Sequence, residues 1–89
     1  MPEKSADLWN FPCAFPIKIM GETVDSLQGS ILDIVTRHAP DYDVSTVESR
    51  ASGNGKYTSL TCTITAVSKE QLDGLYKELT SHPLVKVVL

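Results

Sequence analysis

The fold of this chain is decided by one stretch, YTSLTCTITAVSKEQLDGLYKELTSHPLVKVVL, which runs from Tyr57 to Leu89. Over residues 57–67 apolar and polar residues alternate, as in a strand with one buried face. The inward positions are predicted to be Leu60, Cys62, Ile64 and Ala66, and the outward positions Ser59, Thr61, Thr63 and Thr65. We therefore expect this segment to be a central strand of a sheet.

A helix and a last strand follow this segment. Residues 68–71, Ser-Lys-Glu-Gln, form a capping box, in which the serine side chain accepts a hydrogen bond from a free backbone N–H and the glutamine reaches back along the chain. The helix is predicted to bury Leu72, Leu75, Tyr76 and Leu79. His82-Pro83 ends the helix because proline cannot continue it. Residues 84–89 then form a strand whose core side is predicted to carry Val85, Val87 and Leu89.

The first half of the chain supplies the remaining elements. Residues 15–20 alternate and predict a strand that ends at Gly21, with Phe15, Ile17 and Ile19 on one face and Lys18 and Met20 on the other. Residues 25–28, Asp-Ser-Leu-Gln, have the form of a second capping box. The helix predicted from there to Ala39 has an apolar stripe of Val24, Leu27, Ile31, Ile34 and Val35. Residues 44–51 are predicted to form an edge strand, and residues 52–56 a hairpin turn.

This order of elements, β-α-β-β-α-β, predicts an α+β fold. Right-handed crossovers give the ferredoxin-like arrangement, a four-stranded antiparallel sheet of order 4-1-3-2 with both helices on one face. The other face is expected to be open. Residues 8–89 are predicted to form this single domain, with Leu8, Trp9 and Phe11 folding back against it, and the polar residues 1–7 are expected to be disordered.

Composition excludes several classes of function. The formal net charge is −3 and no cluster of Lys and Arg is present, which argues against nucleic acid as a partner. No apolar stretch approaches the length of a membrane span. No spacing of His, Cys and acidic residues suggests a metal site, a catalytic site or a bound cofactor. Because residues 1–7 contain no apolar segment typical of a signal peptide, we expect a cytoplasmic protein with free thiols.

A set of short motifs in fixed order identifies a resemblance. They are Phe11-Pro12, Lys18-Ile19-Met20-Gly21, Arg37-His38-Ala39-Pro40, Gly55-Lys56-Tyr57, Leu75-Tyr76-Lys77-Glu78-Leu79 and Val88-Leu89. Together they resemble the YbeD-like family of small bacterial cytosolic proteins, over residues 8–89. The resemblance implies a ferredoxin-like fold similar to that of ACT domains, which are regulatory modules that bind amino acids. It implies no catalytic residues.

The histidines and cysteines are the residues most able to carry chemistry. His38 and His82 are predicted at opposite ends of the sheet, about 20 Å apart for a strand of about six residues, too far to share a metal ion. We expect both to be structural, His38 at a helix C-terminus and His82 at a helix stop. Cys62 is expected to be a buried, inert thiol, and Cys13 to be more accessible.

Two surfaces are candidates for binding. In ACT domains a glycine between the first strand and helix lets a ligand approach the chain, so Gly21, Glu22 and Thr23 are the predicted site for an amino-acid-like ligand. The alternative is that Gly21 is only a turn glycine. Glu22 favours this alternative, because its carboxylate would repel the carboxylate of a ligand. The open sheet face is the second candidate, with predicted interaction residues Lys18, Met20, Thr61, Thr63, Lys86 and Val88.

These observations support three hypotheses of function. The first is a non-enzymatic regulatory module that associates with a partner protein or with itself. The second is a structural adaptor that docks an enzyme on its open sheet face without any ligand. The third is a small enzyme completed only in an oligomer, in which His38 and Asp41 or Asp43 meet a second chain.

Overall fold

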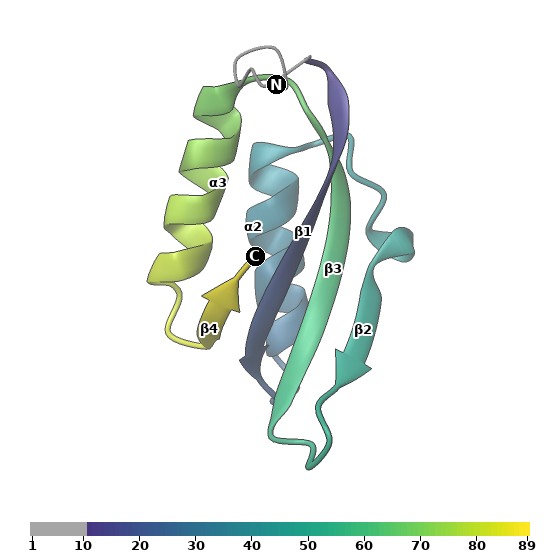
Figure 1. Ribbon diagram of the computed structural model, residues 1–89, viewed down its shortest axis with the longest axis vertical. Coiled ribbons are helices and arrows are strands. Elements are labelled where there is room, and N and C mark those ends of the chain that lie inside the picture. Colours follow the sequence, from purple (N-terminus) through teal and green to yellow (C-terminus); the bar gives the residue numbers. More distant parts are fainter. Residues whose placement is uncertain (1–10) are drawn as a thin grey trace, which may run out of the picture.

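Two helices pack on one face of a four-stranded antiparallel sheet in the computed structural model, which describes residues 11–89 (Figure 1). The strands are β1 (Cys13–Glu22), β2 (Glu48–Ala51), β3 (Tyr57–Ala66) and β4 (Val85–Val88), and the helices are α2 (Leu27–His38) and α3 (Lys69–Ser81). The sheet order is β2-β3-β1-β4, so the predicted ferredoxin-like topology is confirmed. The expectations for residues 1–7, Leu8 and Trp9 concern residues outside the described part.

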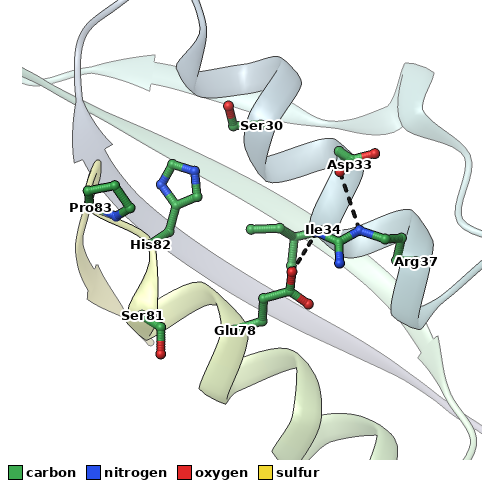
Figure 2. A pocket seen from close by; sticks show the side chains of 8 residues that line it. All are labelled: Ser30, Asp33, Ile34, Arg37, Glu78, Ser81, His82 and Pro83. Atoms are coloured by element: carbon green, nitrogen blue, oxygen red, sulfur yellow. Dashed lines mark hydrogen bonds and ion pairs between the residues drawn. The ribbon is translucent and has the colours of Figure 1, made fainter.

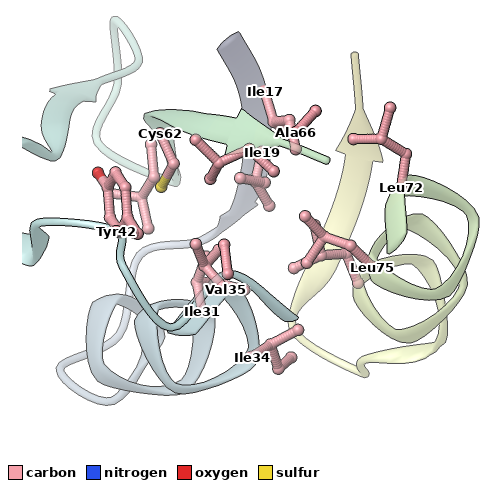
Figure 3. Packing of buried hydrophobic residues seen from close by; sticks show 14 of the residues in the cluster. Ile17, Ile19, Ile31, Ile34, Val35, Tyr42, Cys62, Ala66, Leu72 and Leu75 are labelled. Atoms are coloured by element: carbon pink, nitrogen blue, oxygen red, sulfur yellow. The ribbon is translucent and has the colours of Figure 1, made fainter. Parts of the chain in front are cut away.

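The core lies between the helices and the two central strands (Figure 3). In the β1–β3 pair, Ile17 lies opposite Cys62 and Ile19 opposite Leu60, and all four side chains are buried, as the alternation predicts. The helices contribute a second apolar layer at positions three and four residues apart. Its buried members are Leu27, Ile31, Ile34 and Val35 from α2 and Leu72, Leu75 and Leu79 from α3. Two members of the predicted stripes differ, since Tyr76 is half-buried and Val24 is exposed ahead of α2.

The two predicted capping boxes behave differently. At α3, Ser68 Oγ accepts a hydrogen bond from the Gln71 backbone N–H at 3.0 Å, as predicted. The Gln71 side chain reaches back one residue further than expected, since its Oε1 accepts from the Val67 N–H at 2.7 Å. At α2 the prediction is wrong. The helix begins at Leu27 after Ser26, which makes no side-chain capping bond, and a turn closed by Leu27 N–H to Val24 O leads into it.

The edge strand predicted over residues 44–51 is shorter in the structure. Only Glu48–Ala51 pairs with β3, while Val44–Thr46 form a single 3₁₀ turn. The Asp43 side chain explains the difference, because its Oδ1 accepts from both the backbone N–H and the hydroxyl of Ser45. An aspartate that bonds its own backbone two residues on favours a turn over an extended strand.

A β-bulge in β4 reverses part of its predicted facing. Val87 lies opposite Met20, and Val85 lies opposite Gly21. Between these two pairs β4 therefore has one more residue, Lys86, than β1. An extra residue shifts the alternation of every position after it. Val85 and Val88 therefore pack against the core, whereas Val87 and Leu89 are 43% and 70% exposed. The predictions that Val87 and Leu89 face the core and that Val88 faces outward are wrong.

Candidate functional site

Gly21, the centre of the predicted ligand site, is enclosed by the protein's own atoms. A Cβ atom at this position would lie 2.7 Å from Leu27 Cδ1 and 2.7 Å from the carbonyl oxygen of Leu84. Both distances are below any normal contact, so only glycine allows β1, the start of α2 and the start of β4 to meet here. The glycine is therefore accounted for by internal packing, without a ligand.

The backbone N–H groups of Glu22 and Thr23 also have internal partners. They donate to the carbonyl oxygens of Leu84 and Lys56, each at 3.0 Å. The Glu22 carboxylate pairs with Lys86 Nζ at 3.2 Å, and the Thr23 hydroxyl lies 2.8 Å from that of Thr58. A ligand at this junction would have to compete with these contacts for the N–H groups.

The predicted interaction residues lie across the open face of the sheet. The strand register places two rows of side chains there, Lys18–Thr61–Glu48 and Met20–Ser59–Arg50, each running from β1 through β3 to β2. Thr63 lies further along β3, and Lys86 reaches this face through its pair with Glu22. The register thus brings together all the predicted face residues except Val88, which the bulge turns toward the core.

Apolar side chains occupy the β4 side of this open face. Val87 lies opposite Met20, and Leu89 exchanges two backbone hydrogen bonds with Lys18. We call Met20, Val87 and Leu89 the apolar strip. Val87 and Leu89 could not be predicted on this face, because the bulge that exposes them has no mark in the sequence.

A polar hollow of about 260 Å³ lies beside this strip. Its lining residues are Lys18, Glu48, Ser49, Arg50, Ser59 and Thr61. Glu48 and Arg50 could not be placed on this face from the sequence, because the weak alternation of the edge strand does not specify its facing. Once that strand is paired with β3, opposite Thr61 and Ser59, their position on this face follows from the register alone.

A second hollow, of about 340 Å³, lies between the helices on the other side of the molecule (Figure 2). An ion-pair network lines it, in which Arg37 of α2 bridges Asp33 on its own helix and Glu78 of α3. His38 Nε2 lies 2.8 Å from the other oxygen of Glu78. Hydrogen bonds from His38 and Arg37 hold the pKa of the Glu78 carboxyl below its ordinary value. These contacts join the two helices, so the network has a structural role.

Each histidine has its own local partner. The His38 ring lies over Gly74 of α3, where a Cβ atom would be 3.3 Å from the ring Cε1, and the His38 carbonyl accepts from Gln71 Nε2 at 2.8 Å. His82 Nδ1 instead accepts from the Leu84 N–H at 3.1 Å, beyond the end of α3. Close packing of His38 explains why a glycine stands at position 74.

The buried thiol and phenol lie within the core. Cys62 is fully buried, and burial raises the pKa of its thiol, whereas Cys13 is half-buried. The Tyr42 hydroxyl is buried without a hydrogen-bond partner among residues 11–89. Among the same residues no group of three or more His, Cys, Asp and Glu side chains is placed to hold a metal ion. No helix in this part of the chain is long and apolar enough to span a membrane.

Residues 6–89 match the family described as a protein of unknown function, DUF493. The chain belongs to the DUF493 family. UPF0250 proteins of Nitrosomonas europaea and Chromobacterium violaceum are 52% and 46% identical to it, each over 100% of both chains. The YbeD-like resemblance drawn from the sequence motifs is confirmed.

Solved structures confirm the ACT-like fold of this DUF493 protein. The ACT domain of the GTP pyrophosphokinase of Chlorobium tepidum superposes with a TM-score of 0.66 and 19% identity, covering 86% of this chain and 97% of that domain. Protein HP0495 of H. pylori superposes with a TM-score of 0.72 and 13% identity, covering 100% and 98%. At these identities the likeness establishes the fold alone.

Proposed function

We propose that this protein is a non-enzymatic regulatory module that binds a partner protein through the open face of its sheet. The apolar strip carries this proposal. Met20 lies opposite Val87, and Leu89 lies opposite Lys18 next along the strand, so the three apolar side chains are neighbours, with Val87 and Leu89 43% and 70% exposed. Both helices of residues 11–89 lie on the other face of the sheet (Figure 1). Apolar side chains gathered on an exposed face favour protein association, because burying them against a partner removes them from water.

The likeness to an ACT domain supports a regulatory role. That domain belongs to a GTP pyrophosphokinase, and a regulatory role is what the resemblance to ACT domains implies. The contacts of Gly21, Glu22 and Thr23 favour association without a ligand at that junction, because their packing and backbone hydrogen bonds are already complete. Titration calorimetry with amino acids tests this point, and heat of binding that Gly21→Ala abolishes would restore the ligand hypothesis.

Two matched valine variants test the docking face. Val87 on the open face and Val24 ahead of α2 are similarly exposed, at 43% and 44%, so Val87→Asp and Val24→Asp replace comparable apolar surface by a charge. Each tagged variant is used to capture proteins from the native cytosol, with quantitative mass spectrometry. Val87→Asp should lose a partner that wild type and Val24→Asp retain. Equal capture by both variants would contradict docking on the open face.

A further inference from the structure

The polar hollow on the open face has hydroxyl groups at its floor and charged groups at its sides. Ser59 and Thr61 of β3 form the floor, because their short side chains lie between longer ones on both neighbouring strands. Lys18 stands on the β1 side, and Glu48 and Arg50 stand on the β2 side. Adjacent strands lie about 4.8 Å apart, so the two sides are separated by about 10 Å at the backbone.

Among residues 11–89, the charged groups at this hollow lack ion-pair partners. Lys18, Glu48 and Arg50 make no ion pair within residues 11–89, whereas the cations Arg37 and Lys69 on the helices are each paired. Two cations and one carboxylate therefore give the hollow a positive excess, although the chain as a whole has a formal net charge of −3. Oppositely charged groups on a partner would be both attracted and oriented here.

The size of the hollow limits what it can hold. A volume of about 260 Å³ is below the roughly 300–1,000 Å³ typical of pockets for small-molecule ligands. It suits one side chain of an approaching protein. Glu48 adds a negative charge at one side, which disfavours a dianion such as phosphate more than a singly charged carboxylate.

We propose that this hollow receives the carboxylate side chain of an aspartate or glutamate on the partner protein. The Arg50 guanidinium can donate hydrogen bonds to both carboxylate oxygens, and Lys18 supplies a second positive charge. The hydroxyls of Ser59 and Thr61 donate hydrogen bonds to the same carboxylate. This inference rests on the proposed function, since the acidic side chain belongs to the partner that covers the apolar strip.

Titration with two blocked peptides tests the hollow directly. Acetyl-Gly-Glu-Gly-amide and its glutamine counterpart are added to ¹⁵N-labelled protein, and amide chemical shifts are followed by NMR. At about ten millimolar, where a millimolar site is mostly occupied, the glutamate peptide should shift the amides of residues 18, 48–50 and 59–61. The glutamine peptide should not, and added salt should weaken the response.

Charge variants give the matched control. The double variant Lys18→Gln/Arg50→Gln should bind the glutamate peptide about tenfold more weakly or worse, as expected for losing charged hydrogen bonds. Lys56→Gln/Lys77→Gln removes the same charge from exposed positions outside the hollow and should bind as wild type does. Equal weakening by both pairs, or no shifts with the glutamate peptide, would overturn the proposal.

Three further outcomes separate this proposal from a small-anion site and from the docking face itself. Free glutamate or phosphate that binds more tightly than the blocked peptide would assign the hollow to a small anion instead of a partner side chain, and would overturn the inference. If the peptide titration fails while Val87→Asp still abolishes partner capture, the carboxylate site is wrong and the docking face stands. If neither Val87→Asp nor Lys18→Gln/Arg50→Gln changes partner capture, both proposals fail.

Discussion

At the scale of single residues, two glycines differ in whether the packing of the fold requires them. Gly21 is enclosed by Leu27 and the Leu84 carbonyl, whereas a Cβ atom at Gly29 of α2 would meet nothing within 4 Å. Gly21→Ala should lower the free energy of unfolding by about 1–3 kcal/mol through overpacking. Gly29→Ala should raise it by about 0.5–1 kcal/mol, because alanine favours the helix. Urea denaturation measures both changes, and equal effects at the two sites would contradict the packing described for Gly21.

The two cysteines differ in access. Cys62 is fully buried and burial raises the pKa of its thiol, so it should react with a thiol reagent only as fast as the protein unfolds. Cys13 is half-buried and should react first in native protein. Mass spectrometry after a short exposure to iodoacetamide distinguishes the sites. Rapid labelling of Cys62 in native protein would show that β3 faces the other way.

Residue facing could be predicted from the sequence in the central strands but not at the edges. In β3 strict alternation specifies which side is buried, and Leu60, Cys62 and Ile64 follow it. In β4 three valines in four positions leave the pattern ambiguous, and the bulge at Lys86 decides it. The exposed Val87 of the candidate site could not be found for that reason, since a bulge depends on how β1 and β4 pair in three dimensions.

At the scale of secondary-structure elements, the two helices begin in different ways. Ser68→Ala should destabilise the protein by about 1 kcal/mol, because it removes the side-chain bond to Gln71 at the start of α3. Ser26→Ala is the matched control at the start of α2, where the serine makes no such bond, and should be nearly neutral. Thermal unfolding compares the two, and a larger effect at Ser26 would contradict these helix starts.

The sequence predicted both helices because their apolar stripes are long and regular, but it could not distinguish a working cap from an unused one. Both starts carry a polar residue followed three positions later by glutamine. Gln71 of α3 also donates a hydrogen bond to the His38 carbonyl of α2, a contact between two residues that are 33 positions apart in sequence. Whether a capping motif is used depends on such contacts, which only the assembled fold provides.

At the scale of the whole molecule, the ion pairs between the helices make stability depend on pH. The pKa of Glu78 is lowered in the folded protein, chiefly by the hydrogen bond from His38, so its contribution to stability is full above the ordinary carboxyl pKa of 4.5. This contribution is lost as the pH falls below that value, because the unfolded chain binds the proton more readily.

A variant isolates this contribution. Glu78→Gln should lower stability at neutral pH and should lose less stability than wild type on acidification, because the side chain no longer titrates. Urea midpoints measured from neutral pH to about one unit below 4.5 check the comparison. Parallel profiles of stability against pH for wild type and variant would show that Glu78 contributes nothing to the loss of stability at acid pH.

The bulged strand at the edge of the sheet has a consequence for chain length. Because Lys86 is surplus to the pairing with β1, its deletion leaves Val85, Val87 and Val88 on their present sides and removes only an exposed contact with Glu22, a loss of about 0–1 kcal/mol. Deleting Thr63 from β3 would instead move Ile64 and Ala66 to the opposite side of the sheet. The shortened β4 protein should give a cooperative unfolding transition, and the shortened β3 protein should not. We therefore expect the protein to tolerate the loss of one residue in the edge strand β4, whereas the same loss in the central strand β3 should prevent folding.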